Sequence, residues 1–370
     1  MRQVLARCSL VAGFALLASS TTARAQKPGP ALPPAVAPAP SGAALRGIYL
    51  NAWAFGDSRF RKLVALADTT EVNAFVIDIK DDTGYLTYRS QVATAIAIGA
   101  NSKLRARDTE ERIKLLKSNG IRAVARIVVA KDPLLAVGKP EWSIKSRDGG
   151  LWSDRKRSHW VDGFNDSVWV YAAELAAEAV KLGFEEIQYD YVRFPDEPKS
   201  RMATAVFPAR RGQESSREGI TRNLKLLGAR TRALKVPFTI DVFGLTTTAE
   251  GDMGIGQFWE DLVTTADVVL PMVYPSHYQP GVYNVARPNS QPYTMVHRSL
   301  QDGIRRSAAL GQPKTAEIRP YLQAFTLGPP QYTPTQVRDQ IRATEDLGLR
   351  SWVLWNPGSR YDPRIFRPRG

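Results

Sequence analysis

Short apolar runs alternate with segments of helical spacing from Gly47 to the end of the chain. Runs rich in Val, Ile, Phe and Tyr are typical of buried strands, whereas apolar residues that recur every three to four positions are typical of helices with one covered face. The expected strands are Gly47–Phe55, Ala74–Lys80, Arg122–Ala130, Glu186–Phe194, Pro237–Leu245, Val268–Tyr274, Ile318–Phe325 and Ser351–Asn356. The helices expected between them are Arg59–Asp68, Thr109–Ser118, Val168–Leu182, Ser216–Leu234, Gln257–Thr265, Val296–Leu310 and Thr335–Leu347.

This alternation predicts an α/β fold of the (β/α)8 TIM-barrel type, in which eight parallel strands close into a cylinder surrounded by helices. An open doubly wound sheet is the alternative. It is disfavoured because the chain after the first strand reads Gly56-Asp57-Ser58-Arg59, without the glycine-rich turn that binds dinucleotides. The sequence contains no P-loop and no other cofactor motif, so we expect no cofactor.

The connections between these elements differ in length according to direction. Those from helix to strand are short, as at Asn119-Gly120-Ile121, whereas the longest from strand to helix are Asp81–Asp108, Lys131–Ser167, Pro195–Ser215 and Pro275–Met295. In a barrel every strand-to-helix loop emerges at the carboxyl end of the strands. We therefore expect long loops at that end, and the functional site among them.

The beginning of the chain has the pattern of an export signal. Arg2 and Arg7 precede the apolar run Cys8–Ala18, and Ala23-Arg24-Ala25 resembles a cleavage site. The apolar run is shorter than the ~20 residues that span a bilayer, so we expect no stable membrane insertion after cleavage. The expected organisation is a signal peptide over residues 1–25, an Ala/Pro-rich disordered linker over 26–45 and a barrel domain over 46–370, in a periplasmic or secreted protein.

Composition and charge narrow the chemistry. The chain is 44% hydrophobic and carries three His residues that are too scattered for a His-ligated metal site, so we expect no metal. Asp81-Asp82 and Asp154 could bind calcium, although solvated turns explain these clusters better. The formal charge is +14, and basic residues gather in the loops after the third and fourth strands: Arg147, Arg155, Lys156, Arg157, Arg201, Arg210, Arg211 and Arg217. This pattern suits an anionic polysaccharide or a merely solvated basic surface, and we expect no nucleic-acid partner.

Several expected strands carry polar residues that a barrel core would reject unless they are paired. By two-residue alternation, Asp78, Lys80 and Asp82 share one face of the second strand. The third strand carries Arg126, and the fourth carries Gln188 together with Asp190. A buried ion network, such as Asp78 with Lys80 or Arg126, is one explanation, and a functional site is the other.

Asp190 and Asp241 lie late in neighbouring strands, so we expect the two carboxylates to face each other across one opening. Two carboxyl groups in different environments can divide the roles of proton donor and ionised partner, as glycoside hydrolysis requires. A separation of about 5–5.5 Å would imply retention of configuration, and about 6.5–9.5 Å inversion. Aromatic residues in the long loops, among them Trp142, Trp152 and Trp160, either stack on sugar rings or cover the barrel rim.

Five stretches of the chain resemble a bacterial family of barrel glycoside hydrolases, most of whose members are uncharacterised. They are residues 78–84 (DIKDDTG), 148–152 (DGGLW), 183–195 (GFEEIQYDYVRFP), 271–278 (PMVYPSHY) and 352–357 (WVLWNP). That family is similar in turn to the α-amylase group of retaining barrels. The resemblance implies that Asp190 is the nucleophile and Asp241 the acid/base.

The sequence departs from the α-amylase pattern at three places. Gln188 stands where that group has an Arg, Asp241 stands where it usually has a Glu, and the seventh strand lacks its Asn-His-Asp. Arg126 or Arg193 could supply the missing positive charge.

The sequence therefore predicts an exported glycoside hydrolase that cleaves a polysaccharide or oligosaccharide with two carboxylates, Asp190 and Asp241, by a retaining mechanism. The expected substrate-binding residues are Asp78, Lys80, Arg126, Trp152, Gln188, Tyr191, Arg193, Tyr274, His277 and Trp355. The alternative is a barrel at the cell envelope that binds carbohydrate without cleaving it.

Overall fold

The computed structural model describes residues 44–369. The predicted signal peptide and nearly all of the predicted linker lie outside these residues. Leu45, expected at the end of the linker, instead packs inside the sheet, where its backbone N–H donates to the Ser351 hydroxyl at 3.1 Å. The folded part therefore begins slightly earlier than we expected.

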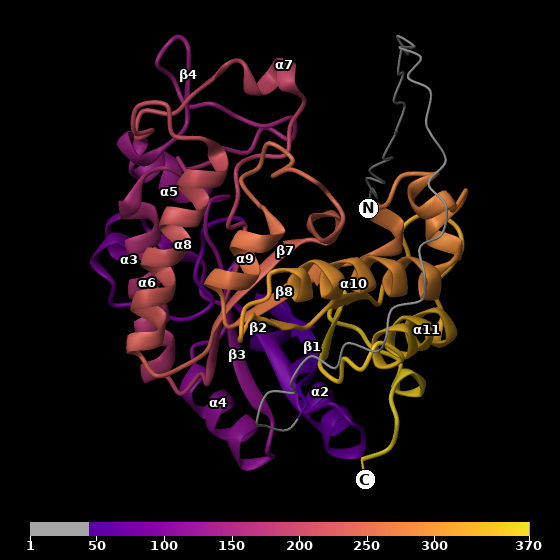
Figure 1. Cartoon of the computed structure of the whole chain (residues 1–370). Helices are drawn as coiled ribbons and strands as arrows, with labels where there is room; N and C mark the ends of the chain where they lie inside the picture. Colours follow the sequence, from indigo (N-terminus) through magenta and orange to yellow (C-terminus); the bar gives the residue numbers. More distant parts are fainter. Residues whose placement is uncertain (1–43, 370) are drawn as a thin grey trace, which may run out of the picture. The chain divides into compact units, whose positions relative to one another are not determined.

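Parallel strands form a closed barrel surrounded by helices (Figure 1), which confirms the predicted fold class. The barrel strands are β1 (Arg46–Leu50), β2 (Ala74–Lys80), β3 (Arg122–Val128), β5 (Glu186–Asp190), β7 (Phe238–Phe243), β8 (Val268–Met272), β9 (Glu317–Ile318), β10 (Tyr321–Gln323) and β11 (Trp352–Trp355). The seventh position is divided between β9 and β10 because Pro320 lies between them and has no N–H for the ladder. Pairing of β10 with both β8 and β11 closes the cylinder.

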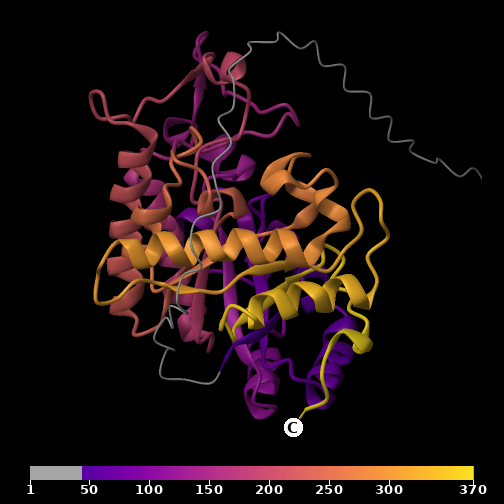
Figure 2. The same ribbon diagram turned by 45° about the vertical axis from the view of Figure 1, so that its right-hand side comes forward.

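The predicted helices are all present. They are α2 (Arg59–Thr69), α4 (Thr109–Ser118), α6 (Asp166–Lys181), α8 (Ser216–Ala233), α9 (Trp259–Thr265), α10 (Pro292–Ala309) and α11 (Pro334–Glu345). Side-chain caps fix where several of them begin: Ser215 and Glu218 form a capping box on α8, as do Thr333 and Gln336 on α11. Figures 1 and 2 both show α10 beside α11, and these two helices pack together on the barrel.

Most of the predicted strands end one or two residues early, and two of them end four or five residues early, each for a local reason. The first strand ends at Leu50, because the Asn51 side chain accepts from the Ala54 N–H at 2.8 Å and starts the short helix α1 (Ala52–Gly56). The fourth ends at Asp190, because Tyr191 adopts a left-handed conformation with φ of 54° and leaves the ladder.

The long loops gather at the carboxyl end of the strands, at the top of Figure 1. They contain the short helices α3 (Ala93–Ala97), α5 (Pro133–Gly138) and α7 (Lys199–Met202). Strand β4 (Lys145–Ser146) pairs antiparallel with β6 (Ala205–Val206), which ties the loop after β3 to the loop after β5. Within residues 44–369, no helix has the length and apolarity needed to cross a membrane.

The apolar core has two layers. The larger one lies between the barrel wall and the helices, and the smaller one fills the barrel interior with residues such as Tyr49, Val76 and Leu270. Near the amino end of the barrel, Arg319 pairs with Glu186 at 2.6 Å, and both side chains are buried. At this end, the barrel interior therefore contains a buried ion pair in addition to apolar side chains.

Lys80 does not share a face with Asp78, so the expectation drawn from strict alternation is wrong for this residue. The pairing of β2 with β3 shifts register between Asp78 and Lys80, which places Lys80 level with the outward-facing Ile127. Its ammonium group pairs with Asp132 at 2.7 Å and donates to the Val128 carbonyl at 2.5 Å. With 1% exposure, Lys80 is a structural residue of the barrel wall.

Asp132→Asn tests this buried pair. The amide keeps an oxygen that can accept from the Leu135 N–H at the start of α5, but it removes the charge that balances Lys80. We expect the free energy of unfolding to fall by about 3 kcal/mol or more, because an unpaired buried charge typically costs about 3–5 kcal/mol.

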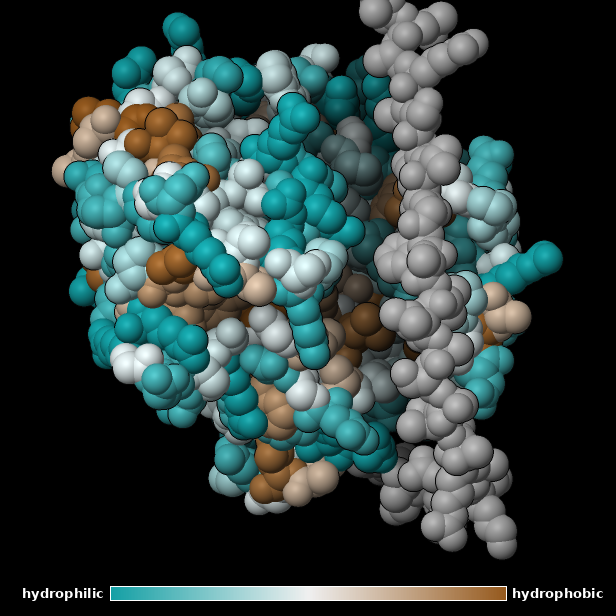
Figure 3. Space-filling model, turned by 90° about the horizontal axis from the view of Figure 1, so that it is seen from above, coloured by the Kyte–Doolittle hydropathy of each residue, from teal (hydrophilic) through white to brown (hydrophobic). Residues whose placement is uncertain are grey.

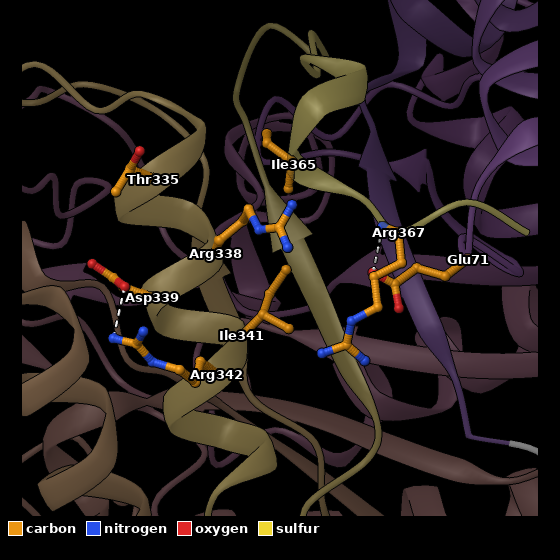
Figure 4. Close-up of a pocket in the computed structure, with 8 residues that line it drawn as sticks. All are labelled: Glu71, Thr335, Arg338, Asp339, Ile341, Arg342, Ile365 and Arg367. Carbon is orange, nitrogen blue, oxygen red and sulfur yellow. Dashed lines mark hydrogen bonds and ion pairs between the residues drawn. The ribbon is translucent and has the colours of Figure 1, made fainter.

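Asp339→Asn is the matched control, since it removes the same charge from the exposed pair with Arg342 (Figure 4). We expect a loss below about 1 kcal/mol for this surface pair. Urea unfolding followed by circular dichroism measures both variants. Equal losses would contradict the structural role assigned to the Lys80–Asp132 pair.

Candidate active site

Arg126 lies at the centre of a cluster of three carboxylates inside the barrel. From β3 its Nη1 donates to Asp78 Oδ1 at 2.5 Å, and its Nε donates to Asp190 Oδ2 at 3.2 Å. Nη2 also donates to Asp190, and Nε lies 3.6 Å from Asp241 Oδ2. Four strands, β2, β3, β5 and β7, therefore contribute one charged side chain each to a single network. Asp78 pairs with Arg126, as one sequence interpretation proposed, but not with Lys80.

Asp190 is the carboxylate nearest to the opening, with 6% of its surface exposed. Its Oδ1 accepts from the backbone N–H of Tyr191 at 2.5 Å, and its Oδ2 accepts from Arg126. Left-handed backbone in a residue other than Gly is uncommon and often lies at functional sites. Tyr191, the residue with this left-handed backbone (φ of 54°), is also the one whose N–H donates to Asp190.

Asp241 is almost fully enclosed, at 1% exposure. Gln188 Nε2 donates to its Oδ2 at 2.9 Å, while its Oδ1 is buried without a hydrogen-bond partner among the described residues. Burial, and next the charge of Asp190, raise the pKa of Asp241 well above the ordinary value, and the nearby Arg126 opposes them. This carboxyl group is therefore the one that keeps its proton most readily.

Asp78 is the third carboxyl group of the cluster. It accepts a hydrogen bond from the Tyr49 hydroxyl as well as from Arg126. Burial raises the pKa of Asp78 to about 6, against the opposing charge of Arg126. Asp78 therefore titrates in a range where ordinary aspartates are already ionised.

The two predicted catalytic carboxylates are close neighbours inside the barrel. Since Arg126 Nε lies 3.2 Å from Asp190 Oδ2 and 3.6 Å from Asp241 Oδ2, these two oxygens are less than about 7 Å apart. The expectation of a shared opening applies to Asp190, whereas Asp241 is enclosed. Of the two arginines considered for the positive charge beside Asp190, Arg126 is the one that pairs with this carboxylate. Gln188, which stands where the α-amylase group has an Arg, donates to Asp241.

Aromatic side chains form one side of the opening. Tyr274 stacks on Trp355 with ring centroids 5.2 Å apart and an angle of 21°. Phe325 packs edge-on against both rings, and His277 packs against Tyr274. Three of the predicted substrate contacts, Tyr274, His277 and Trp355, are thus brought together, and we call these four residues the aromatic wall.

Trp152 lies elsewhere. It is 2% exposed, and its indole N–H donates to the Thr204 hydroxyl at 3.1 Å. This contact joins the loops after β3 and β5. The side chain is therefore occupied in holding the loops together and does not face the opening.

Sequence reasoning missed three residues of this region. The Tyr49 hydroxyl binds Asp78, the Tyr321 hydroxyl accepts from Gln188 Nε2 at 3.1 Å, and Phe325 belongs to the aromatic wall. All three were counted only as apolar strand residues. The available signal was that tyrosines at inward-facing positions of a barrel need a polar partner for the hydroxyl group.

Figure 3 looks onto the loop-bearing end and shows a hollow right of its centre, with hydrophilic and hydrophobic residues in its depth. The two pockets described, of 350 and 420 Å³, lie elsewhere, on the outside of the barrel. The first is lined by Glu71, Arg338, Ile341 and Arg367, between α11 and the C-terminal segment (Figure 4). Neither contains a residue of the carboxylate cluster.

Among the described residues, no group of three or more His, Cys, Asp or Glu side chains is arranged to hold a metal ion. The carboxylates of the cluster are instead bridged by the Arg126 guanidinium. The acidic loop residues considered for calcium bind protein groups: Asp81 accepts from Thr83, Asp82 pairs with Lys131 and Asp154 accepts from Trp160.

The chain belongs to the family described as "Putative glycosyl hydrolase domain", whose model matches residues 47–361. This membership places it among the glycoside hydrolases and confirms the resemblance drawn from the five sequence stretches. A search of the curated proteins found no match.

Solved structures share the fold. The glycoside hydrolase domain of PgaB (BpsB) from Bordetella bronchiseptica is 14% identical, with a TM-score of 0.58 over 86% of this chain and 95% of that one. The α-galactosidase TtGalA from Thermus thermophilus, in complex with stachyose, is 14% identical, with a TM-score of 0.52 over 87% of this chain and 64% of that one. A hypothetical protein from Ruminiclostridium thermocellum is 38% identical over 49% of this chain and 90% of its own, with a TM-score of 0.44.

The raised pKa of Asp78 predicts a pH-dependent stability. Because the folded protein binds this proton more tightly than the unfolded chain, folding loses stability as pH rises from about 4 through about 6. Asp78→Asn carries no titrating group. Between pH 4 and pH 7.5 we therefore expect the unfolding free energy of Asp78→Asn to rise relative to wild type by about 2–3 kcal/mol.

Urea unfolding at a series of pH values measures this difference, and any constant offset from the lost ion pair cancels. If the wild-type and variant curves ran parallel across this range, Asp78 would not have the raised pKa, and the assignment of its environment would be wrong.

Proposed function

We propose that this protein hydrolyses O-glycosidic bonds of a polysaccharide or oligosaccharide by a two-step, retaining mechanism. Asp190 is the nucleophile and Asp241 the general acid and base. The observation that carries this proposal is that both carboxylates share the Arg126 guanidinium in different environments, one at the opening and one enclosed. Such a division of environments is what separates the two roles in glycosidases.

The contacts of Asp190 suit a nucleophile. Arg126 and the Tyr191 N–H fix the orientation of the carboxylate and balance its charge. Its position at the strand end, with some of its surface exposed, lets it meet a sugar ring placed in the opening. Attack on the anomeric carbon would form a glycosyl ester, which water then hydrolyses.

The surroundings of Asp241 suit a proton donor. Its raised pKa favours the protonated form, which a proton donor requires. Its Oδ1 is buried without a hydrogen-bond partner among the described residues, so no protein group accepts a proton from this atom. The upper limit of about 7 Å between the two Oδ2 atoms is compatible with the 5–5.5 Å separation of retaining enzymes.

The aromatic wall suits a sugar substrate. Sugar rings present apolar C–H faces, and the partly exposed Trp355 and Phe325 offer rings on which such faces can stack. Stacking would hold one sugar ring with its polar edge toward Asp190, the most exposed carboxylate of the cluster. We place substrate binding at this wall.

Separate Asp190→Asn and Asp241→Asn variants test the catalytic assignment. We expect each to lower kcat by about 10³-fold or more on a glycan that the wild type cleaves, because each removes a group acting in the transition state, with little change in binding. A glycan panel with product analysis identifies the substrate, and calorimetry measures the retained binding.

Asp261→Asn is the control, since it removes a carboxylate on α9, outside the cluster, that pairs with Arg217 on α8. It should keep its activity. A wild-type protein that binds glycans without cleaving any, and whose two cluster variants change only the affinity, would instead be the non-catalytic carbohydrate-binding barrel.

We further propose that the protein is exported to the periplasm or secreted, on the basis of the charged, apolar and Ala-x-Ala regions within residues 1–25. We expect the exported chain to begin at Gln26. N-terminal sequencing and intact-mass measurement of the protein recovered from the periplasmic and medium fractions would show this. Recovery of the full chain from the cytoplasm alone would contradict export.

A further inference from the structure

Arg193 is a buried arginine at the carboxyl end of the barrel. It follows β5 by three residues and is 8% exposed. Its guanidinium lies among three aromatic rings, 4.4 Å from the centroid of Phe243, 4.8 Å from that of Tyr191 and 5.2 Å from that of Trp160. Contacts of this kind hold an arginine in place and partly compensate for its lost hydration.

Its hydrogen bonding is incomplete. Nη1 donates to the Phe194 carbonyl at 2.9 Å, while Nε and Nη2 have no acceptor among the described residues. Arg193 as a whole keeps 8% of its surface exposed. Among the described residues, no carboxylate lies within ion-pair distance of Arg193; burial lowers its pKa, and the nearby Tyr191, Asp190 and Asp196 oppose this shift. A buried cation without an anion is costly, which suggests that a ligand supplies the anion.

The free edge of Arg193 has the geometry that binds carboxylates elsewhere in this protein. Nε and Nη2 lie on one edge of the planar guanidinium and can make two parallel hydrogen bonds. In Arg217 the same two nitrogens hold the two oxygens of Asp261 at 2.5 and 2.8 Å. In Arg306 they hold those of Glu260 at 2.7 and 2.6 Å. Arg193 presents this edge unoccupied.

The position of Arg193 places this edge beside the proposed cleavage site. Its ring neighbours Tyr191 and Phe243 are partly exposed, and they follow Asp190 and Asp241 along β5 and β7 by one and two residues. The other cation near Tyr191 is Lys131, 5.4 Å from the ring centroid, and its charge is already balanced by Asp82 at 2.6 Å. Arg193 is thus the cation of this rim that lacks a protein anion among the described residues.

We propose that Arg193 binds the carboxylate of a uronic acid residue next to Asp190, so that the substrate is an acidic, uronate-containing glycan. This inference rests on the proposed function, since it names the substrate class of the same site. A planar carboxylate matches the free Nε and Nη2 edge in the way that Asp261 matches Arg217. The aromatic rings around Arg193 fix the direction of this edge before the ligand arrives.

The experiment compares uronate oligosaccharides with their carboxyl-reduced, neutral counterparts. Galacturonate, glucuronate and mannuronate tetrasaccharides are titrated calorimetrically into the full chain carrying Asp190→Asn, which prevents cleavage. We expect at least one uronate to bind about tenfold or more tightly than its neutral counterpart, as two charge-assisted hydrogen bonds provide. Arg193→Gln should abolish this preference.

Arg342→Gln is the matched control, because it removes one positive charge from an exposed position on α11, on the outside of the barrel. It should retain the preference. Arg193→Lys guards against misfolding of the Gln variant, since it keeps the charge but cannot form two parallel bonds, and it should lose most of the preference.

Equal binding of acidic and neutral glycans, no binding of any uronate, or a preference that persists without Arg193 would overturn the inference. Sulfated neutral oligosaccharides form a further arm, and Arg193-dependent binding of these alone would contradict the carboxylate assignment. Hydrolysis by the wild type is measured separately. Arg193-dependent uronate binding without cleavage would contradict the proposed function alone, and cleavage of neutral glycans only would contradict this inference alone.

Discussion

The interior of this barrel depends on one guanidinium group. Three aspartates from β2, β5 and β7 point into the cylinder, and burying them without a cation would cost far more than the surrounding apolar contacts could offset. Arg126 contacts all three, so the cluster is held as a unit by four strands that are distant in sequence. The three carboxyl groups are not equivalent, because each contacts different nitrogen atoms of Arg126 or lies at a different distance from them, and each is buried to a different degree.

Much of this arrangement follows from local rules that act on the sequence. Alternation along the strands placed Asp78, Arg126, Gln188, Asp190 and Asp241 inside the barrel, because these segments are regular up to those positions. The same rule failed at Lys80, where a register shift turns the next side chain outward. The predicted ends of the first and fourth strands, Phe55 and Phe194, were also too late. The strands stop at the Asn51 cap and before the left-handed Tyr191, and hydrophobic periodicity does not reveal such single-residue effects.

The residues that the sequence did not reveal are those whose role depends on a partner from a distant strand. Tyr49 acquires its role from Asp78, and Tyr321 acquires its role from Gln188. Each tyrosine reads as an apolar core residue until the register of the closed barrel is known. Trp152 is the opposite case: it reads as a candidate sugar contact, and only the tie between the loops after β3 and β5 shows that its indole is occupied.

The rim of the barrel is chemically divided, and this division gives a bound glycan a direction. The aromatic wall belongs to the ends of β8, β10 and β11, whereas Arg193 lies by β5 and β7, with the carboxylate cluster between these two parts of the rim. In the proposed complex, a sugar ring stacked on the wall would present its edge to Asp190, and an acidic group on the neighbouring sugar would lie toward Arg193. A ligand in the reverse orientation would place its charge against the aromatic rings and leave Arg193 without an anion. The position of one unpaired arginine can therefore decide which end of the chain enters the site.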